Sequence, residues 1–170
     1  AYYEYVTTEE FPQTISWIDE FENVMVTRTF SKAYGLAAYR IGYAVARAEL
    51  IAKINVARLP FNTSAIAQIA AIGALKGQKF IKKCVKKNAE GRDKLESYCK
   101  EMNIKFYPSQ ANFVYMEVSE SVKLAMKLEE KGYIVRAFPT GIRVTIPSEK
   151  VLEKFIKVFS KVYKAKSVEK

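Results

Sequence analysis

Two hydrophobic periods alternate along this chain. β-Branched and apolar residues run through positions 23–30 and 41–46, and each run predicts a buried strand. Elsewhere apolar residues recur at helical spacing, which predicts helices over residues 47–58, 65–76 and 79–102 and a short helix over residues 14–21. Strands that alternate with helices in this way are typical of an α/β architecture.

The helix predicted over residues 65–76 is strongly apolar. Its alanines and isoleucines predict burial on several sides. Thr63 or Ser64 is expected to cap its first turn, and Gly77 is expected to end it. The longer, lysine-rich helix that follows contains Gly91, which weakens a helix by up to about 1 kcal/mol.

The second half of the chain repeats the alternation over shorter segments. Its pattern predicts strands over residues 104–107 and 112–118, a helix over 120–131, a hairpin of 133–138 with 141–146, and a last helix over 148–165. Ser148 is expected to be the N-cap of that last helix. The sequence therefore predicts a second, smaller α/β unit.

Composition narrows the classes of protein. The chain has 170 residues, 49% of them hydrophobic, which excludes a disordered segment and allows one domain or a domain with part of another. Neither a membrane span nor a signal peptide is expected. The chain has no histidine, which excludes Ser-His and Cys-His triads and His-ligated zinc. Cys84 and Cys99 lack metal-site spacing, so we expect free thiols and no metal.

The formal charge of +10 raises the alternative of a basic module that binds nucleic acid. Lysines concentrate in residues 76–87 and 150–170. In both stretches they alternate with apolar residues near helical spacing, as they do on a helix with one solvated face. We therefore expect no nucleic-acid partner.

One lysine lies where chemistry is expected. Lys32 follows the strand predicted over residues 23–30, stands next to Ser31, and precedes Arg40 by eight residues. A lysine at a strand end can be held out of bulk water and lose its proton, which makes it an amine nucleophile. The Arg40 fork suits a phosphate. Pyridoxal phosphate requires an amine for its aldehyde and a cationic group that binds its phosphate. The alternative interpretation of Lys32 is an ordinary surface lysine.

The stretch from Thr29 to Tyr43, TFSKAYGLAAYRIGY, resembles the Schiff-base lysine motif of fold-type I pyridoxal-phosphate aminotransferases, closest to the histidinol-phosphate aminotransferase branch. Ala38 stands where that branch usually has glycine. The opening residues AYYEY match the end of the family motif D-E-A-Y-x-E-F. The resemblance therefore implies the C-terminal half of such an enzyme, as a fragment that begins after the family's aspartate.

The resemblance implies roles for residues of the first half. Lys32 would hold the cofactor pyridoxal 5′-phosphate and act as general base, and Arg40 would bind its phosphate. Thr29 and Ser31 offer hydroxyls near that phosphate, and Tyr2 matches the tyrosine that hydrogen-bonds the ring oxygen of the cofactor.

It also implies two substrate-binding arginines in the second half. Arg143, in GIRVTI, matches the arginine that binds the substrate α-carboxylate, although Pro147 replaces a glycine that often follows this motif. Arg136 matches a second arginine near the far end of the substrate. The alternative for Arg136 is an ordinary charge on an edge strand.

The fold that the resemblance implies has two parts. Residues 1–76 would be the C-terminal part of the cofactor-binding large domain, whose sheet is mixed and mostly parallel, residues 77–103 a connecting helix, and residues 104–170 the small C-terminal α/β domain. We expect residues 104–170 to be the better-ordered part, and the 1–75 part to expose apolar faces and either associate with another chain or stay partly mobile.

The implied activity is transfer of an amino group between an amino acid or amine, histidinol phosphate in the nearest branch, and 2-oxoglutarate, in histidine biosynthesis. The intact protein is expected to be a cytoplasmic homodimer that acts on small amino-acid and oxo-acid substrates, and the fragment alone to be inactive. The alternatives on the same scaffold are an aromatic or aspartate-type aminotransferase and a threonine-phosphate decarboxylase. A non-catalytic basic binding module is a more distant alternative.

Overall fold

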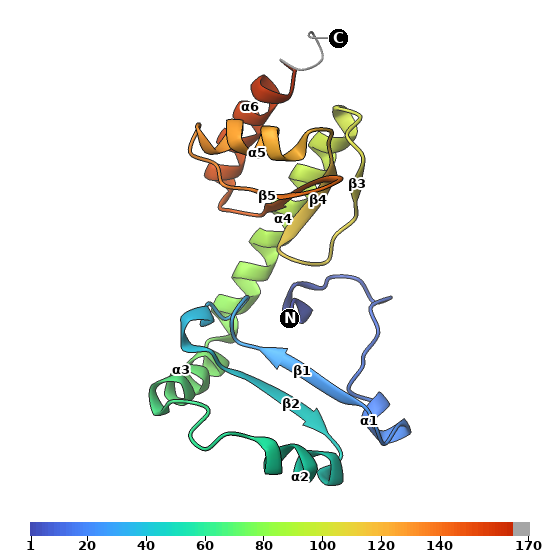
Figure 1. Cartoon of the computed structure of the whole chain (residues 1–170), viewed down its shortest axis with the longest axis vertical. Coiled ribbons are helices and arrows are strands. Elements are labelled where there is room, and N and C mark those ends of the chain that lie inside the picture. The colour runs from blue at the N-terminus through green and yellow to red at the C-terminus, as the bar shows by residue number, and fades with distance from the viewer. Residues whose placement is uncertain (165–170) are drawn as a thin grey trace. The chain divides into compact units, whose positions relative to one another are not determined.

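The computed structural model describes residues 1–164 of the chain (Figure 1). It divides into two compact units, Ala1–Cys84 and Val85–Lys170, which we call unit 1 and unit 2 and describe separately. The last residue of the helix predicted over 148–165 lies outside the described residues. The domain limits expected from the resemblance stay a prediction.

Unit 1 is built around two strands. β1 (Met25–Thr29) and β2 (Gly42–Ala46) pair antiparallel, with Val26 opposite Val45. The mostly parallel sheet was expected of a whole large domain, and these two strands do not pair in parallel. The other elements of the unit are η1 (Tyr3–Tyr5), α1 (Trp17–Glu20), η2 (Ala37–Tyr39), α2 (Ala48–Ala57), α3 (Ala65–Lys76) and the first part of α4 (Gln78–Glu101).

The caps of α3 follow the expected chemistry. The backbone amide of Ala67 donates to Ser64 Oγ at 3.2 Å, so Ser64 rather than Thr63 caps the helix. Gly77 is the C-cap residue. The bounds of the strands and helices of unit 1 also agree with the predicted ranges to within two residues at most ends.

Burial in unit 1 differs from the prediction. The strand predicted as buried over residues 41–46 is exposed from Gly42 to Val45. In α3 only Ala67 and Ala71 are buried, whereas its isoleucines are exposed, so the prediction of burial on several sides was wrong for the described chain. The physical reason is that a two-stranded sheet and short helices offer too little surface to cover every apolar face. The exposed apolar faces expected of this part are therefore present.

Unit 2 contains a four-stranded antiparallel sheet in the order β3-β4-β6-β5. Its strands are β3 (Phe106–Tyr107), β4 (Phe113–Glu117), β5 (Arg136–Phe138) and β6 (Gly141–Thr145), and its helices besides α4 are α5 (Ser121–Glu129) and α6 (Glu149–Lys164) (Figure 1). The predicted hairpin and the predicted helices are confirmed. β5 is shorter than predicted because its pairing with β6 begins only at Arg136.

One face of this sheet forms the core of unit 2. Alternate residues of β4 and β6 are buried, as expected of a sheet with one covered face. These residues pack with apolar side chains of α4, α5 and α6. The fully buried members of the cluster are Leu95, Cys99, Val114, Met116, Leu124, Leu128, Ile142, Leu152 and Phe159. The opposite face of the sheet is left for other contacts.

Gly91 has a packing role in this core. A Cβ at Gly91 would lie 2.6 Å from Cγ2 of Ile146, which is closer than side-chain atoms approach. The glycine therefore lets α4 lie against the end of β6, which offsets its low helix propensity. Among the described residues, no helix has the length and apolar character needed to cross a membrane.

Candidate functional site

Lys32 lies just past the end of β1, in a turn fixed by its neighbours. Phe30 and Ala33 on either side are 5% exposed, so they anchor the turn in unit 1. The amide of Gly35 donates to the carbonyl of Lys32 at 2.9 Å, and Gly35 has a φ of +72°, which a glycine adopts without strain. The Lys32 side chain is exposed, so the expectation that it is held out of bulk water is not met within this chain.

Tyr2 and Lys32 are brought together although 30 positions separate them. The Nζ atom of Lys32 lies 5.7 Å from the centre of the Tyr2 ring. The ring of Tyr2 is half-buried, so it offers a fixed face to the ammonium group. The structure thus pairs a phenol with the candidate amine.

The hydroxyls near Lys32 have a backbone role. The amide of Ser31 donates to Thr29 Oγ1 at 3.0 Å, which fixes the chain between the strand and the lysine. This is a local turn of the type that serine and threonine hydroxyls favour. The hydroxyl of Thr29 keeps its own proton for a further acceptor.

Arg40 has an unusual backbone. It is the C-cap of η2, with φ 52° and ψ 46° in the left-handed region, which non-glycine residues rarely adopt. Its exposed guanidinium donates through Nη1 to the carbonyl of Ala37 at 2.7 Å. Phe61, Asn103 and Glu120 share this left-handed backbone, so the conformation fixes where the Arg40 side chain leaves the turn without by itself marking a functional residue.

Arg136 and Arg143 are directly opposite each other on β5 and β6. Cross-strand partners point to the same face of a sheet, so the two guanidinium groups share the outer face of unit 2. Arg143 is half-buried, and its Nε atom is buried without a hydrogen-bond partner among residues 1–164. The structure therefore brings the two predicted substrate arginines together.

Each of these arginines lies over an aromatic ring. The guanidinium carbon of Arg143 is 4.9 Å from the centre of Phe113, and that of Arg136 is 5.3 Å from the centre of Phe138. None of the ion pairs between residues 1 and 164 involves either arginine, nor Lys32. The outer face thus holds two positive charges that no carboxylate of the described chain neutralises.

A carboxylate on the same face is already engaged. Glu117 accepts hydrogen bonds from Tyr107 and from Lys105, the latter at 3.0 Å, and these two contacts, the one from Tyr107 first, lower the pKa of Glu117. Tyr115 lies between Tyr107 and Phe138, with ring centres 5.9 Å and 5.8 Å away. Sequence reasoning missed this aromatic row, which the alternation of residues in the strand predicted over 112–118 could have indicated.

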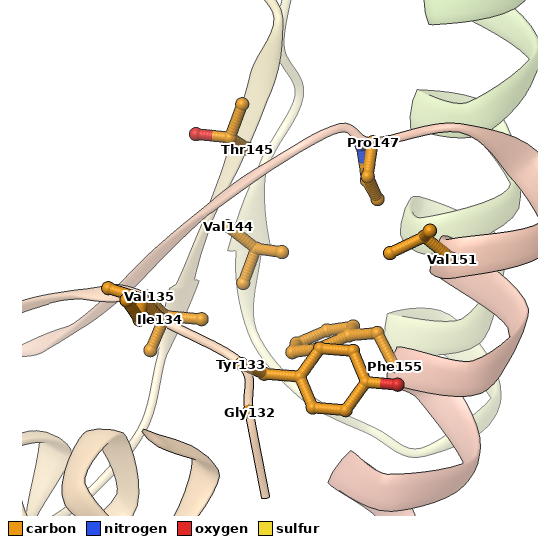
Figure 2. A pocket seen from close by; sticks show the side chains of 9 residues that line it. All are labelled: Gly132, Tyr133, Ile134, Val135, Val144, Thr145, Pro147, Val151 and Phe155. Atoms are coloured by element: carbon orange, nitrogen blue, oxygen red, sulfur yellow. The ribbon is translucent and has the colours of Figure 1, made fainter.

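A pocket of about 260 Å³ lies elsewhere in unit 2 (Figure 2). Tyr133 and Phe155 pack edge to face along one side of it, with ring centres 5.6 Å apart. Its lining residues are Gly132, Tyr133, Ile134, Val135, Val144, Thr145, Pro147, Val151 and Phe155. None is charged, so this pocket does not contain the predicted anion-binding residues.

The described residues hold no group of three or more metal-ligating side chains. Both cysteines are free thiols. Cys99 is fully buried, and this burial raises the pKa of its thiol to about 12. A thiol with such a pKa is not a nucleophile at neutral pH.

Comparison with known proteins gives a consistent result. The family model described as aminotransferase class I and II matches residues 1–159. Histidinol-phosphate aminotransferase 2 of Bacillus cereus is 45% identical over 166 residues, which are 98% of this chain and 45% of the relative. Histidinol-phosphate aminotransferase of Bacillus cytotoxicus is 51% identical over 152 residues, which are 86% of this chain and 41% of the relative.

Among solved structures, histidinol-phosphate aminotransferase of Sinorhizobium meliloti in complex with pyridoxal-5′-phosphate superposes with a TM-score of 0.83 at 28% identity. The match covers 97% of this chain and 47% of that one. The chain therefore spans about half the length of the relatives that it matches.

Proposed function

Because this chain belongs to the aminotransferase class I and II family, we propose that it is the C-terminal part of a pyridoxal-phosphate-dependent aminotransferase of the histidinol-phosphate type. The observation that carries the proposal is Lys32, which stands at the end of β1 beside the Tyr2 ring, within a sequence 45% identical to the Bacillus cereus relative. The activity of the whole protein would be amino-group transfer between small amino-acid and oxo-acid molecules.

The residues of unit 1 fit the cofactor. Lys32 offers an exposed amine outside any ion pair of the described chain, which an aldehyde can reach. Tyr2 would donate a hydrogen bond to the ring oxygen, and Arg40, Thr29 and Ser31 would bind the phosphate. When bound, pyridoxal phosphate supplies an aldehyde and an electron-withdrawing ring. Lys32 would then take the proton from the substrate Cα and return it on the other side of the transfer.

The arginines of unit 2 fit the anionic groups of the substrates. Arg143 would bind an α-carboxylate through two parallel N–H donors. Arg136 would bind the anion at the far end of the substrate, such as the second carboxylate of glutamate or 2-oxoglutarate. Two unneutralised arginines opposite each other are costly without a ligand, which supports an anion between or beside them. We infer a reversible transfer of the amino group between histidinol phosphate and 2-oxoglutarate, and a place for it in histidine biosynthesis.

The rest of the active site would come from the part of the relatives that this chain does not cover. Exposed apolar side chains in unit 1, such as Phe61 and Ile69, support a further chain segment or a second subunit packed there. We propose a cytoplasmic homodimer as the working form. The 170-residue chain alone is expected to show no transamination, because its Lys32 remains open to water.

A chimera tests this function. It joins this chain to the part of the Bacillus cereus relative that the match does not cover, and we call this protein the chimera. We expect it to transfer the amino group of histidinol phosphate to 2-oxoglutarate, and Lys32→Ala to abolish the reaction. A preference for aromatic amino acids or aspartate, or decarboxylation of threonine phosphate, would favour the alternatives on this scaffold. Lack of any activity in a folded chimera that binds pyridoxal phosphate would refute the proposal.

A further inference from the structure

We propose that Phe113 is a positioning residue for Arg143, and that its ring holds the guanidinium in place so that the Nη groups are presented to the α-carboxylate of a substrate. This inference rests on the proposed function, since the carboxylate is that of an aminotransferase substrate. It adds a residue of the sheet whose side chain has no reactive group.

The position of Phe113 follows from the register of the sheet. Phe113 pairs with Thr145, so it lies diagonally across from Arg143 on the outer face of unit 2. The distance of 4.9 Å from the guanidinium carbon to the ring centre is within the range of a cation–π contact. The ring therefore restricts where the guanidinium can lie.

An aromatic ring holds a cation without neutralising it. Unit 2 pairs other cations with carboxylates, as in Lys94 with Glu153 at 2.6 Å and Lys105 with Glu117 at 3.0 Å. Arg143 has a ring in place of such a carboxylate, and so its charge is available to a ligand. Arg136 has the same arrangement over Phe138.

The buried Nε atom shows how the Arg143 guanidinium is oriented over the Phe113 ring. Within residues 1–164 this N–H has no acceptor, which is rare for a buried donor. Arginine binds a carboxylate most firmly through two parallel N–H groups. The Nη atoms of Arg143 are not among the buried atoms without a partner, so a carboxylate would accept from the two Nη groups while the buried Nε faces the protein. Phe113 would keep the Nη edge of the guanidinium in place before the ligand arrives.

The proposal predicts which substrates depend on Phe113. Glutamate carries an α-carboxylate, whereas histidinol phosphate has a phosphorylated hydroxymethyl group in that place, whose phosphorus lies two bonds farther from Cα than the carboxylate carbon does. Loss of the ring should therefore raise the KM for glutamate about three- to tenfold, the size expected for one cation–π contact. The KM for histidinol phosphate should change less, because its phosphate reaches beyond the place of the α-carboxylate, and the kcat of its half-reaction should stay unchanged.

Nuclear magnetic resonance on the 170-residue chain tests the positioning without any cofactor. The Nε–H signal of Arg143 is assigned by its loss in Arg143→Met. We expect a signal protected from water exchange in the wild type and in Phe113→Tyr, and loss of that protection in Phe113→Leu. Phe138→Leu is the matched control, because it removes the ring under Arg136 and should leave the Arg143 signal protected.

The kinetic arm uses the chimera with glutamate and with histidinol phosphate. Unchanged Arg143 signal and unchanged glutamate KM in Phe113→Leu would overturn the proposal. So would equal effects of Phe113→Leu and Phe113→Tyr, because the aromatic ring that only tyrosine keeps would then make no difference. If Phe113→Leu does not fold, protection in the wild type and its retention in Phe113→Tyr decide the question. An inactive wild-type chimera refutes the proposed function, whereas the resonance experiment still tests the positioning.

Discussion

Replacing Arg143 by methionine should make unit 2 more stable although it removes a binding residue. Methionine keeps an unbranched apolar stem beside Phe113 and removes the guanidinium. Three contributions change. The buried Nε–H without a partner disappears, which raises the free energy of unfolding by about 1–3 kcal/mol. The positive charge opposite Arg136 disappears, which raises the free energy of unfolding by about 0.2–1 kcal/mol.

The loss of the contact with Phe113 opposes these gains. A partly desolvated cation–π contact contributes about 0.5–2 kcal/mol. The sum is a gain of about 1 kcal/mol in the free energy of unfolding. This sign is opposite to that of most single substitutions, and it is expected where a site holds a residue for binding rather than for stability.

Native-state hydrogen exchange measures this gain in unit 2 alone. The amides of Val114 and Ile142 lie in the buried strands, so their slowest exchange reports the opening of the core. Added phosphate should stabilise the wild type and have a smaller effect on Arg143→Met. A loss of stability above about 1 kcal/mol in the variant would refute the reasoning, because Arg143 would then be a structural residue with satisfied contacts.

Three further outcomes follow from other parts of the chain. Gly91→Ala should destabilise unit 2 by about 1–2 kcal/mol in urea unfolding, because the added methyl meets Cγ2 of Ile146 at 2.6 Å, and an unchanged midpoint would contradict this packing. Iodoacetamide at pH 8 should label Cys84 and spare Cys99, whose buried thiol has a pKa of about 12. Because that pKa is raised from 9.0, stability should fall as the pH rises above about 9, and equal labelling of both thiols would contradict the burial. Ile69→Gln should change the unfolding free energy by less than about 0.5 kcal/mol and reduce association in sedimentation experiments, because this side chain is 70% exposed; a large loss of stability would mean that the side chain is covered.

The sequence predicted the elements better than their burial. Hydrophobic periods located both strands of unit 1, and the hydroxyl of Ser64 was correctly among the expected caps. The prediction that the isoleucines of α3 are buried was wrong. Hydrophobic periodicity indicates which face of a helix is apolar, but it does not indicate whether another element covers that face. The same holds for β2, whose apolar residues are exposed in unit 1.

The candidate site shows a similar division. Local sequence indicated Lys32 and its turn, and the alternation of strands put Arg136 and Arg143 on neighbouring strands. Their direct opposition depends on register, which the sequence pattern did not determine. The contact between Arg143 and Phe113 joins two strands far apart in the chain, so it required the structure. The roles of all these residues toward cofactor and substrate stay predictions.

The attachment site of pyridoxal phosphate on the chimera tests the central claim most directly. The protein is incubated with the cofactor, reduced with borohydride to a stable secondary amine, digested and mapped by mass spectrometry. The expected result is one modified lysine, Lys32, and no modification at that peptide in Lys32→Arg. An adduct on another lysine such as Lys53, or none in a folded protein, would contradict the assignment of Lys32 and the function built on it.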